Sequence, residues 1–270
     1  MAKPSRVPRL GPPHQQAARE AQERPMLLRA LSLIETVAAA DKGLSLSDLS
    51  AQLGVPKPTV FRLTQRLEQE GFLAREPGKR TFAAGPRLLR LGFHTLRNSG
   101  PSAERRAILE ALVASLGETC NFTVPAGSQV LYLDRVETRW PLRLHLEPGS
   151  RVPLHCTASG KLFLASMKPA RRKRLLDSIA LTPDTPATII CRDRLEKECA
   201  MIARQGYSTD NEEFLLGLIA VAVPVVDQAG TTVAAVACHA PSARLSLREA
   251  LKKLPDLTEA ARRLAASLSD

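Results

Sequence analysis

The chain has 270 residues, 44% of them hydrophobic, which is enough for two modest domains with real cores and excludes a disordered protein. Its net charge of +11 lies mainly in the first hundred residues, which carry 16 basic and eight acidic side chains and so suit a polyanion. No stretch approaches the roughly 20 apolar residues of a membrane-spanning helix, and the N-terminus lacks the apolar core of a signal peptide, so we expect a cytoplasmic protein.

The first 25 residues contain five prolines among scattered arginines. Proline prevents a continuous helix, and the segment offers little apolar surface to bury. We expect residues 1–25 to form a flexible basic tail. The next segment, residues 26–40, carries Leu27, Leu31 and Ile34 at helical spacing and predicts a first helix.

Residues 45–71 predict two short helices joined by a tight turn. Ser45 and Asp48 have the spacing of a capping box, and Gly54 is a typical helix end. The second helix is expected to open at Pro58 and to bury Val60, Leu63 and Leu67 along one stripe. Its other face is polar and basic, which favours a helix-turn-helix that enters a DNA major groove. The alternative is a helical hairpin with a solvated face.

A hairpin is predicted next, with strands at residues 72–75 and 81–83 around a turn of breaker residues. Lys79 and Arg80 lie at its tip, where they could meet phosphate, so the three elements together predict a winged helix-turn-helix domain over residues 26–85. Arg62 is the best candidate for reading guanine. The residues expected to contact DNA are Lys57, Thr59, Phe61, Arg62, Gln65, Arg66, Lys79 and Arg80.

Residues 86–102 predict an amphipathic helix between two domains, with Leu88 and Leu91 on its apolar side. A second copy of the chain is one partner for this stripe, so the helix is interpreted as a linker and a dimer contact.

Residues 103–270 predict an α+β domain with helices packed on an antiparallel sheet. Alternating or apolar runs predict strands at 120–124, 130–136, 142–146, 219–226 and 232–239. Helical spacing predicts helices at 103–116, 157–167, 169–179, 193–205 and 247–268, the last bent at Pro255.

The histidines and cysteines of this half fit no known catalytic or zinc-binding spacing. The five cysteines contain no C-x-x-C pair and are interpreted as buried reduced thiols. Ser159-Gly160-Lys161 is not a phosphate-binding loop, and no G-x-S-x-G elbow occurs. The side chains that could form a metal or catalytic site are His145, His155, His239, Cys156, Cys238, Asp210 and Glu212. We therefore expect no catalytic residues, no metal and no cofactor.

From Met26 to Ser269 the sequence resembles the IclR family of bacterial transcriptional regulators. In the N-terminal part the matching stretches are GLSLSDL at 43–49, LGVPK at 53–57, TVFRL at 59–63 and GPRLL at 85–89. In the C-terminal part they are LEPGSRVPLH at 146–155, TASGK at 157–161, QGY at 205–207, NEEF at 211–214 and the run from Gly217 to Pro224. Each stretch alone is weak, but their order and spacing together are specific.

The resemblance implies a winged helix-turn-helix, a linker helix and a GAF-like effector-binding domain over residues 103–270. It also implies dimers or dimers of dimers that repress or activate neighbouring operons in response to a small molecule, often a carboxylate or aromatic acid. Backbone N–H groups at Ser159 and Gly160 would make an anion cradle. Carried over by position, the effector-binding residues would be Ala158, Ser159, Gly160, Asp210, Ala220, Ala237 and His239.

Three departures from the family's pattern bear on the ligands. Pro58 replaces a frequent serine near the start of the recognition helix, which removes a hydroxyl and an N–H. Ala220 stands where relatives often have cysteine or serine, and Ala237 with His239 replaces a frequent pair of serines. These changes predict an effector different from those of the relatives.

A rival hypothesis for the whole protein is a ligand-sensing or enzymatic α+β domain whose N-terminal helices bind protein rather than DNA.

Overall fold

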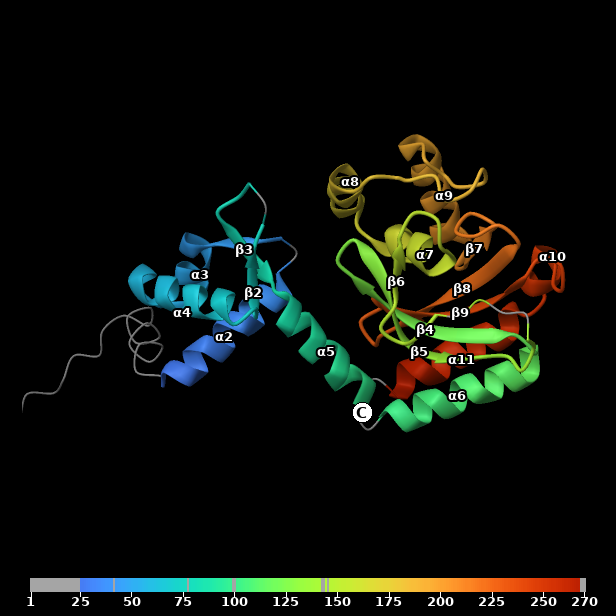
Figure 1. Ribbon diagram of the computed structural model, residues 1–270, viewed down its shortest axis with the longest axis horizontal. Coiled ribbons are helices and arrows are strands. Elements are labelled where there is room, and N and C mark those ends of the chain that lie inside the picture. Colours follow the sequence, from blue (N-terminus) through green and yellow to red (C-terminus); the bar gives the residue numbers. More distant parts are fainter. Residues whose placement is uncertain are drawn as a thin grey trace, which may run out of the picture. The chain divides into compact units, whose positions relative to one another are not determined.

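The computed structural model describes residues 25–40, 42–76, 78–98, 101–141, 144 and 146–267. The chain divides into two compact units, residues 1–95 and 96–270, which are drawn in Figure 1. The expected flexible tail lies outside the described residues, apart from Pro25. No helix of the described part is long and apolar enough to cross a membrane.

The N-terminal unit is a small helical domain with a three-stranded antiparallel sheet of order β1-β3-β2. A two-stranded hairpin was expected, but Leu44 also pairs with Phe82, which brings both side chains into the core. The elements are α2 (Met26–Ala39), β1 (Leu44–Ser45), α3 (Leu46–Leu53), α4 (Lys57–Gln69), β2 (Leu73–Arg75), β3 (Thr81–Ala84) and α5 (Pro86–Asn98), which runs across the boundary between the units.

Local sequence explains why α3 and α4 begin and end where they do. The Ser45 hydroxyl accepts the Asp48 N–H, and the Asp48 carboxylate accepts the Ser45 N–H at 2.9 Å, which completes the predicted capping box. Gly54 ends α3 with a left-handed φ of 65°. Helix α4 begins at Lys57, one residue before the expected start. Pro58 is tolerated there because N–H groups of the first turn have no intrahelical partner.

The C-terminal unit is built on a six-stranded antiparallel sheet of order β6-β5-β4-β9-β8-β7. The strands are β4 (Thr119–Ala126), β5 (Gln129–Val136), β6 (Arg151–Pro153), β7 (Ser208–Asn211), β8 (Leu218–Val226) and β9 (Thr232–Pro241). The central strands β8 and β9 are apolar runs buried on both faces, which explains why the sheet can be covered by helices on both sides.

Helices cover the two faces of this sheet (Figure 1). Helices α6 (Pro101–Leu116) and α11 (Leu254–Ser267) pack against each other and on one face, and α7 (Ala158–Ser166) lies on the other with α9 (Arg192–Gln205) behind it. The remaining helices are α8 (Pro169–Ser178) and α10 (Leu247–Leu251). The single last helix expected at 247–268 is two helices, and Pro255 lies in the first turn of α11.

Two strand predictions differ from the structure. Of the strand expected at 142–146, Leu144 and Leu146 are described and neither is in a strand, while the other three residues lie outside the described part. Strands β6 and β7 were not predicted, because β6 has three residues and β7 has the polar sequence Ser-Thr-Asp-Asn. Pairing with β8 holds β7 in place despite its weak intrinsic preference.

Candidate functional site

The outward face of α4 carries most of the side chains expected to contact DNA. Val60 and Leu63 are buried in the core of the N-terminal unit. Thr59 is half-buried, and Phe61 is 44% exposed although it is a large apolar side chain. The other expected contact residues of this helix, Lys57, Arg62, Gln65 and Arg66, are also exposed. The helix therefore presents a mainly polar and basic surface to solvent, with Phe61 as an apolar side chain within it.

The basic side chains of this surface differ in whether they are already paired. Arg66 forms an ion pair with Glu70 at 3.5 Å, and Lys79 pairs with Glu76 at 3.6 Å. Within the described part of the chain, Lys57, Arg62 and Arg80 are exposed and form no ion pair. These three cations can meet phosphate or a base edge without breaking a pair first.

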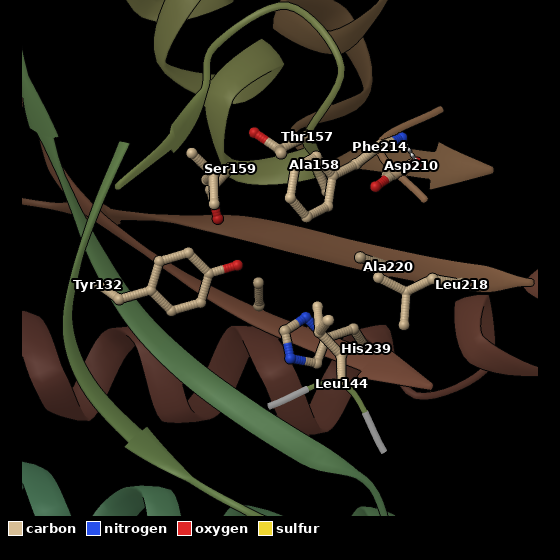
Figure 2. Close-up of a pocket in the computed structure, with 12 residues that line it drawn as sticks. Tyr132, Leu144, Thr157, Ala158, Ser159, Asp210, Phe214, Leu218, Ala220 and His239 are labelled. Atoms are coloured by element: carbon tan, nitrogen blue, oxygen red, sulfur yellow. Dashed lines mark hydrogen bonds between the residues drawn. The ribbon is translucent and has the colours of Figure 1, made fainter. Parts of the chain in front are cut away.

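In the C-terminal unit, a pocket lies between the sheet and the start of α7, and it contains six of the seven residues expected to bind an effector. Those six are Ala158, Ser159, Asp210, Ala220, Ala237 and His239. Sequence reasoning missed the other lining residues, which are Tyr132, Leu144, Val152, Thr157, Phe214 and Leu218. Figure 2 shows the Tyr132 and Ser159 hydroxyls and the His239 ring directed into one common space.

Strand register explains why residues far apart in the sequence meet in this pocket. Asp210 of β7 pairs with Ala220 of β8, and Ala220 pairs with His239 of β9. The three residues therefore form one row across the sheet. Ala237 lies two residues before His239 and faces the same side.

Gly160 is the expected residue that does not line the pocket. A Cβ atom at this position would lie 2.3 Å from the Leu154 carbonyl oxygen, so glycine permits α7 to approach that backbone. The Gly160 N–H donates to the Thr157 hydroxyl at 3.2 Å, which caps the helix. The expected anion cradle cannot use this N–H, although the N–H groups of Ala158 and Ser159 have no intrahelical partner.

Asp210 is a buried carboxyl group at the edge of the pocket. Its Oδ1 accepts the N–H of Glu213 at 2.7 Å and that of Phe214 at 3.3 Å, which fixes its position. Burial raises the pKa of Asp210 to about 7, and the nearby Glu213 carboxylate adds to the rise. Near neutral pH this carboxyl group is therefore partly protonated and can donate a hydrogen bond.

His239 is held in one tautomer by a buried arginine. Arg135 Nη1 lies 2.8 Å from His239 Nε2, and because a guanidinium group only donates, Nε2 must accept. Burial, with the charge of Arg135, lowers the pKa of His239 to about 3, so the ring is neutral and carries its proton on Nδ1. Asn121, whose side chain accepts from Arg135 at 2.9 Å, lies against the same ring.

The pocket offers hydrogen-bond donors in a confined space. Burial raises the pKa of Tyr132 to about 12, so its hydroxyl stays protonated beside the Ser159 hydroxyl and the His239 Nδ1–H. The space open to a water-sized sphere is about 10 Å³, which is room for about one water molecule. A larger molecule can enter only if lining side chains move.

A buried ion pair anchors α7 next to this pocket. Lys161 is 1% exposed, and its ammonium group donates to Glu213 and lies 3.5 Å from Glu198 of α9. Glu213 also supplies the N–H that holds Asp210. The start of α7, the 212–217 turn and the pocket carboxyl group are thus joined by direct contacts.

Among the described residues, one group of metal-ligating side chains lies close together. It consists of His155, Cys156 and Asp184, which are not among the lining residues of the pocket.

Comparison with known proteins relates both units to transcriptional regulators. A family model described as "Bacterial transcriptional regulator IclR C-terminal" matches residues 94–269, and one described as "IclR helix-turn-helix domain" matches residues 26–77. A curated relative, the "Probable transcriptional regulator SauR" of Cupriavidus necator, is 44% identical over 87% of this chain and 93% of its own length.

Two solved structures carry the same fold. The crystal structure of the Thermotoga maritima IclR matches with a TM-score of 0.61 and 26% identity, over 90% of this chain and 98% of that one. The inducer-binding domain of PobR from Acinetobacter, a double mutant solved with 3-hydroxybenzoic acid, matches with a TM-score of 0.57 and 26% identity over 61% of this chain and 97% of that one. The fold predicted from the sequence is confirmed.

Proposed function

Because the chain belongs to the IclR family of bacterial transcriptional regulators, we propose that it binds operator DNA as a dimer or dimer of dimers and is switched by a small anionic molecule in its C-terminal domain. A carboxylate or an aromatic acid is the expected effector. The observation that carries the proposal is the convergence of hydrogen-bond donors on one pocket from three strands, through Tyr132 of β5, Asp210 of β7 and His239 of β9, and from the start of α7.

The DNA-binding part of the proposal rests on the exposed face of α4. Lys57 and Arg62 supply positive charge that no ion pair with another described residue neutralises, and Gln65 supplies an amide that can read a base edge. In a dimer, two such helices would lie about one DNA turn apart, each in a major groove. Arg80 at the hairpin tip is suited to phosphate.

The ligand class is inferred from the polarity of the pocket. The His239 Nδ1–H, the Tyr132 hydroxyl and a protonated Asp210 are each able to donate a hydrogen bond. The buried Arg135, which also pairs with Glu137 at 3.3 Å, lies behind His239. A ligand with anionic oxygen atoms satisfies these donors. The related PobR domain, solved with an aromatic carboxylate, supports the same class.

The switch is proposed to work through the confined space. A ligand larger than one water molecule must displace lining side chains such as Phe214 and Tyr132. Because Lys161 joins α7 to the 212–217 turn, that displacement is expected to move both segments together. Ligand occupancy would then change the separation of the two recognition helices, which couples the two sites.

The dimer is supported by apolar side chains left exposed in the N-terminal unit. Helix α2 exposes Met26, Leu27, Leu28 and Leu31, and α5 exposes Leu89 and Leu91. Apolar side chains at this density are typical of an interface. A second copy of the chain is the occupant we propose, with the protein acting in the cytoplasm and not as an enzyme.

The proposal is tested by measuring binding to the DNA upstream of the protein's own gene. Anisotropy with a labelled fragment and a shuffled fragment of equal composition, at rising salt, should show a selective complex whose affinity falls steeply with salt. Equal affinity for both fragments would favour the rival, in which the N-terminal helices bind protein.

The ligand class is tested separately, by calorimetry with a panel of small acids and their uncharged amides. Acids that bind should also change the affinity for the selected DNA, and the amides should bind at least about tenfold more weakly, since burying an unmatched donor costs roughly 1–3 kcal/mol. Amides that bind as tightly as acids would contradict the anionic class.

A further inference from the structure

His155, Cys156 and Asp184 bring three metal-ligating side chains together outside the pocket. His155 and Cys156 are consecutive, and they lie in the turn between β6 and α7. Asp184 comes from the loop between α8 and α9. One ligand atom from each residue lies within 4.8 Å of the other two. The first two residues are buried and Asp184 is exposed, so a cation could reach the group from solvent.

The hydrogen bond of His155 leaves one ring nitrogen able to bind a cation. Nε2 lies 2.9 Å from the Thr182 carbonyl oxygen. Because a carbonyl oxygen only accepts, Nε2 carries the proton and Nδ1 keeps its lone pair. A ring N–H donated to a backbone carbonyl is the arrangement that orients metal-binding histidines.

The other two ligands are already in contact. The Cys156 thiol donates to Asp184 Oδ2 at 3.2 Å. In a tetrahedral zinc site, with Zn–S of about 2.3 Å and Zn–O of about 2.0 Å, the sulfur and oxygen lie about 3.5 Å apart. Small shifts would therefore bring both atoms to ligand distance.

We propose that His155, Cys156 and Asp184 bind a thiophilic divalent cation such as Zn²⁺. Nitrogen and sulfur donors select such ions over Mg²⁺ or Ca²⁺, which prefer all-oxygen sites. The thiol loses its proton to solvent when the cation binds. Three protein ligands leave the fourth position to water.

A cation at this position would connect two segments that are far apart in the sequence. It would tie the turn that leads into α7, whose first residues line the pocket, to the 179–191 loop. The expected consequence is that the turn leading into α7 is held more firmly beside the pocket when the cation is present. This inference does not depend on which effector or DNA sequence the protein binds.

The test uses the full-length protein, stripped with a chelator and kept reduced. Zinc binding is measured by competition with a chromogenic chelator, and Co²⁺ is added to detect the thiolate-to-cobalt charge-transfer absorption. The wild type should bind one equivalent of Zn²⁺ and show the absorption. Cys156→Ser should lose the absorption, and Cys156→Ser and Asp184→Asn should each bind Zn²⁺ at least about tenfold more weakly, since even outer-shell changes cost about 10–100-fold.

Cys191→Ser is the matched control, because Cys191 is an exposed free thiol at the start of α9. It should bind both ions like the wild type. Asp184 is exposed, so Asp184→Asn should keep the fold, as circular dichroism can verify. Wild-type binding no tighter than that of Asp184→Asn, or an absorption that survives in Cys156→Ser, would overturn the proposal.

Discussion

Arg62 illustrates how much can depend on one exposed side chain. It lies on the outward face of α4, and within the described residues it has no ion-pair partner. We predict that Arg62→Ala weakens binding to the selected DNA by about 1–3 kcal/mol if the guanidinium reads a base. Anisotropy with selected and shuffled fragments measures this loss.

Arg204→Ala is the control for that prediction, because Arg204 is an exposed arginine on α9, in the other unit. It should leave both affinities unchanged. An equal loss on both fragments for Arg62→Ala would instead make Arg62 a phosphate contact.

Asp210 gives the molecule a predictable response to pH. Its folded-state pKa of about 7 lies above the usual 3.8, so between these values the folded chain holds a proton that the unfolded chain releases. The free energy of unfolding should therefore fall as pH rises through this window, by up to about 1.4 kcal/mol per pH unit from this group. His239 acts in the opposite direction, since its lowered pKa costs stability as pH falls.

The contribution of Asp210 is isolated by comparing the wild type with Asp210→Asn in urea at pH 4–8. The asparagine keeps an oxygen for the Glu213 and Phe214 N–H groups, and His239 is unchanged. The wild type should lose stability relative to the variant from about pH 4 to pH 7, with no further change above. Parallel curves for the two proteins would show that Asp210 titrates normally.

At the scale of residues, the sequence predicted some members of the pocket and not others. Ala158 and Ser159 were predicted to line the pocket because they lie in TASGK, a stretch that resembles the family. Tyr132 stands in a stretch without such a signal and joins the pocket through strand pairing. Phe214 belongs to the recognisable stretch NEEF, but nothing in the sequence indicated that the 212–217 turn directs its side chain into the pocket. Arg135 was not predicted to contact His239, because a basic residue in an alternating strand is normally expected on the exposed face. Here its side chain is buried. Whether these residues bind an effector stays a prediction.

Helix α7 depends on a close approach that only glycine permits. Gly160→Ala would place a methyl group against the Leu154 backbone, which cannot move aside like a flexible side chain. We predict a loss of about 1–3 kcal/mol in the free energy of unfolding of the C-terminal unit, as is typical of overpacking. Urea denaturation followed by circular dichroism measures it.

Gly92→Ala provides the contrast within another helix. A Cβ at Gly92 of α5 would meet nothing within 4 Å, so alanine should be neutral or stabilise by up to about 1 kcal/mol. A Gly160→Ala protein as stable as the wild type would mean that α7 can shift without cost.

At the scale of elements, predictions succeeded where the local pattern was strong. The apolar run and hairpin loop around residues 219–239 predicted β8 and β9 to within two residues at each end. The polar strand β7 has no alternating pattern, and the apolar alternation at 142–146 predicted a strand that the described residues there do not form. In both cases pairing with neighbours, rather than intrinsic preference, decides the structure.

At the scale of the whole molecule, we predict that a second copy covers the apolar side chains of α2. Leu27 is 70% exposed, and a carboxylate there could not be buried in an interface without a large cost. Leu27→Asp should raise the dissociation constant of the dimer at least about tenfold, equivalent to about 1.4 kcal/mol, as sedimentation velocity can measure. Selective DNA binding should weaken with it.

Met201→Asp is the matched substitution on α9, where Met201 is 41% exposed. It should leave dimer dissociation unchanged. A Leu27→Asp protein that sediments like the wild type would place the contact between copies elsewhere.

The row formed by Asp210, Ala220 and His239 has a consequence for how such proteins diversify. The ladder between β7, β8 and β9 uses main-chain atoms, so it tolerates exchange of the small side chain at its centre. Substituting Ala220 by serine or cysteine would alter the size and chemistry of the pocket without changing the pairing of the strands that line it. If this pocket binds the effector, as we propose, a lineage could acquire a new effector by one codon change while its recognition helix stays the same.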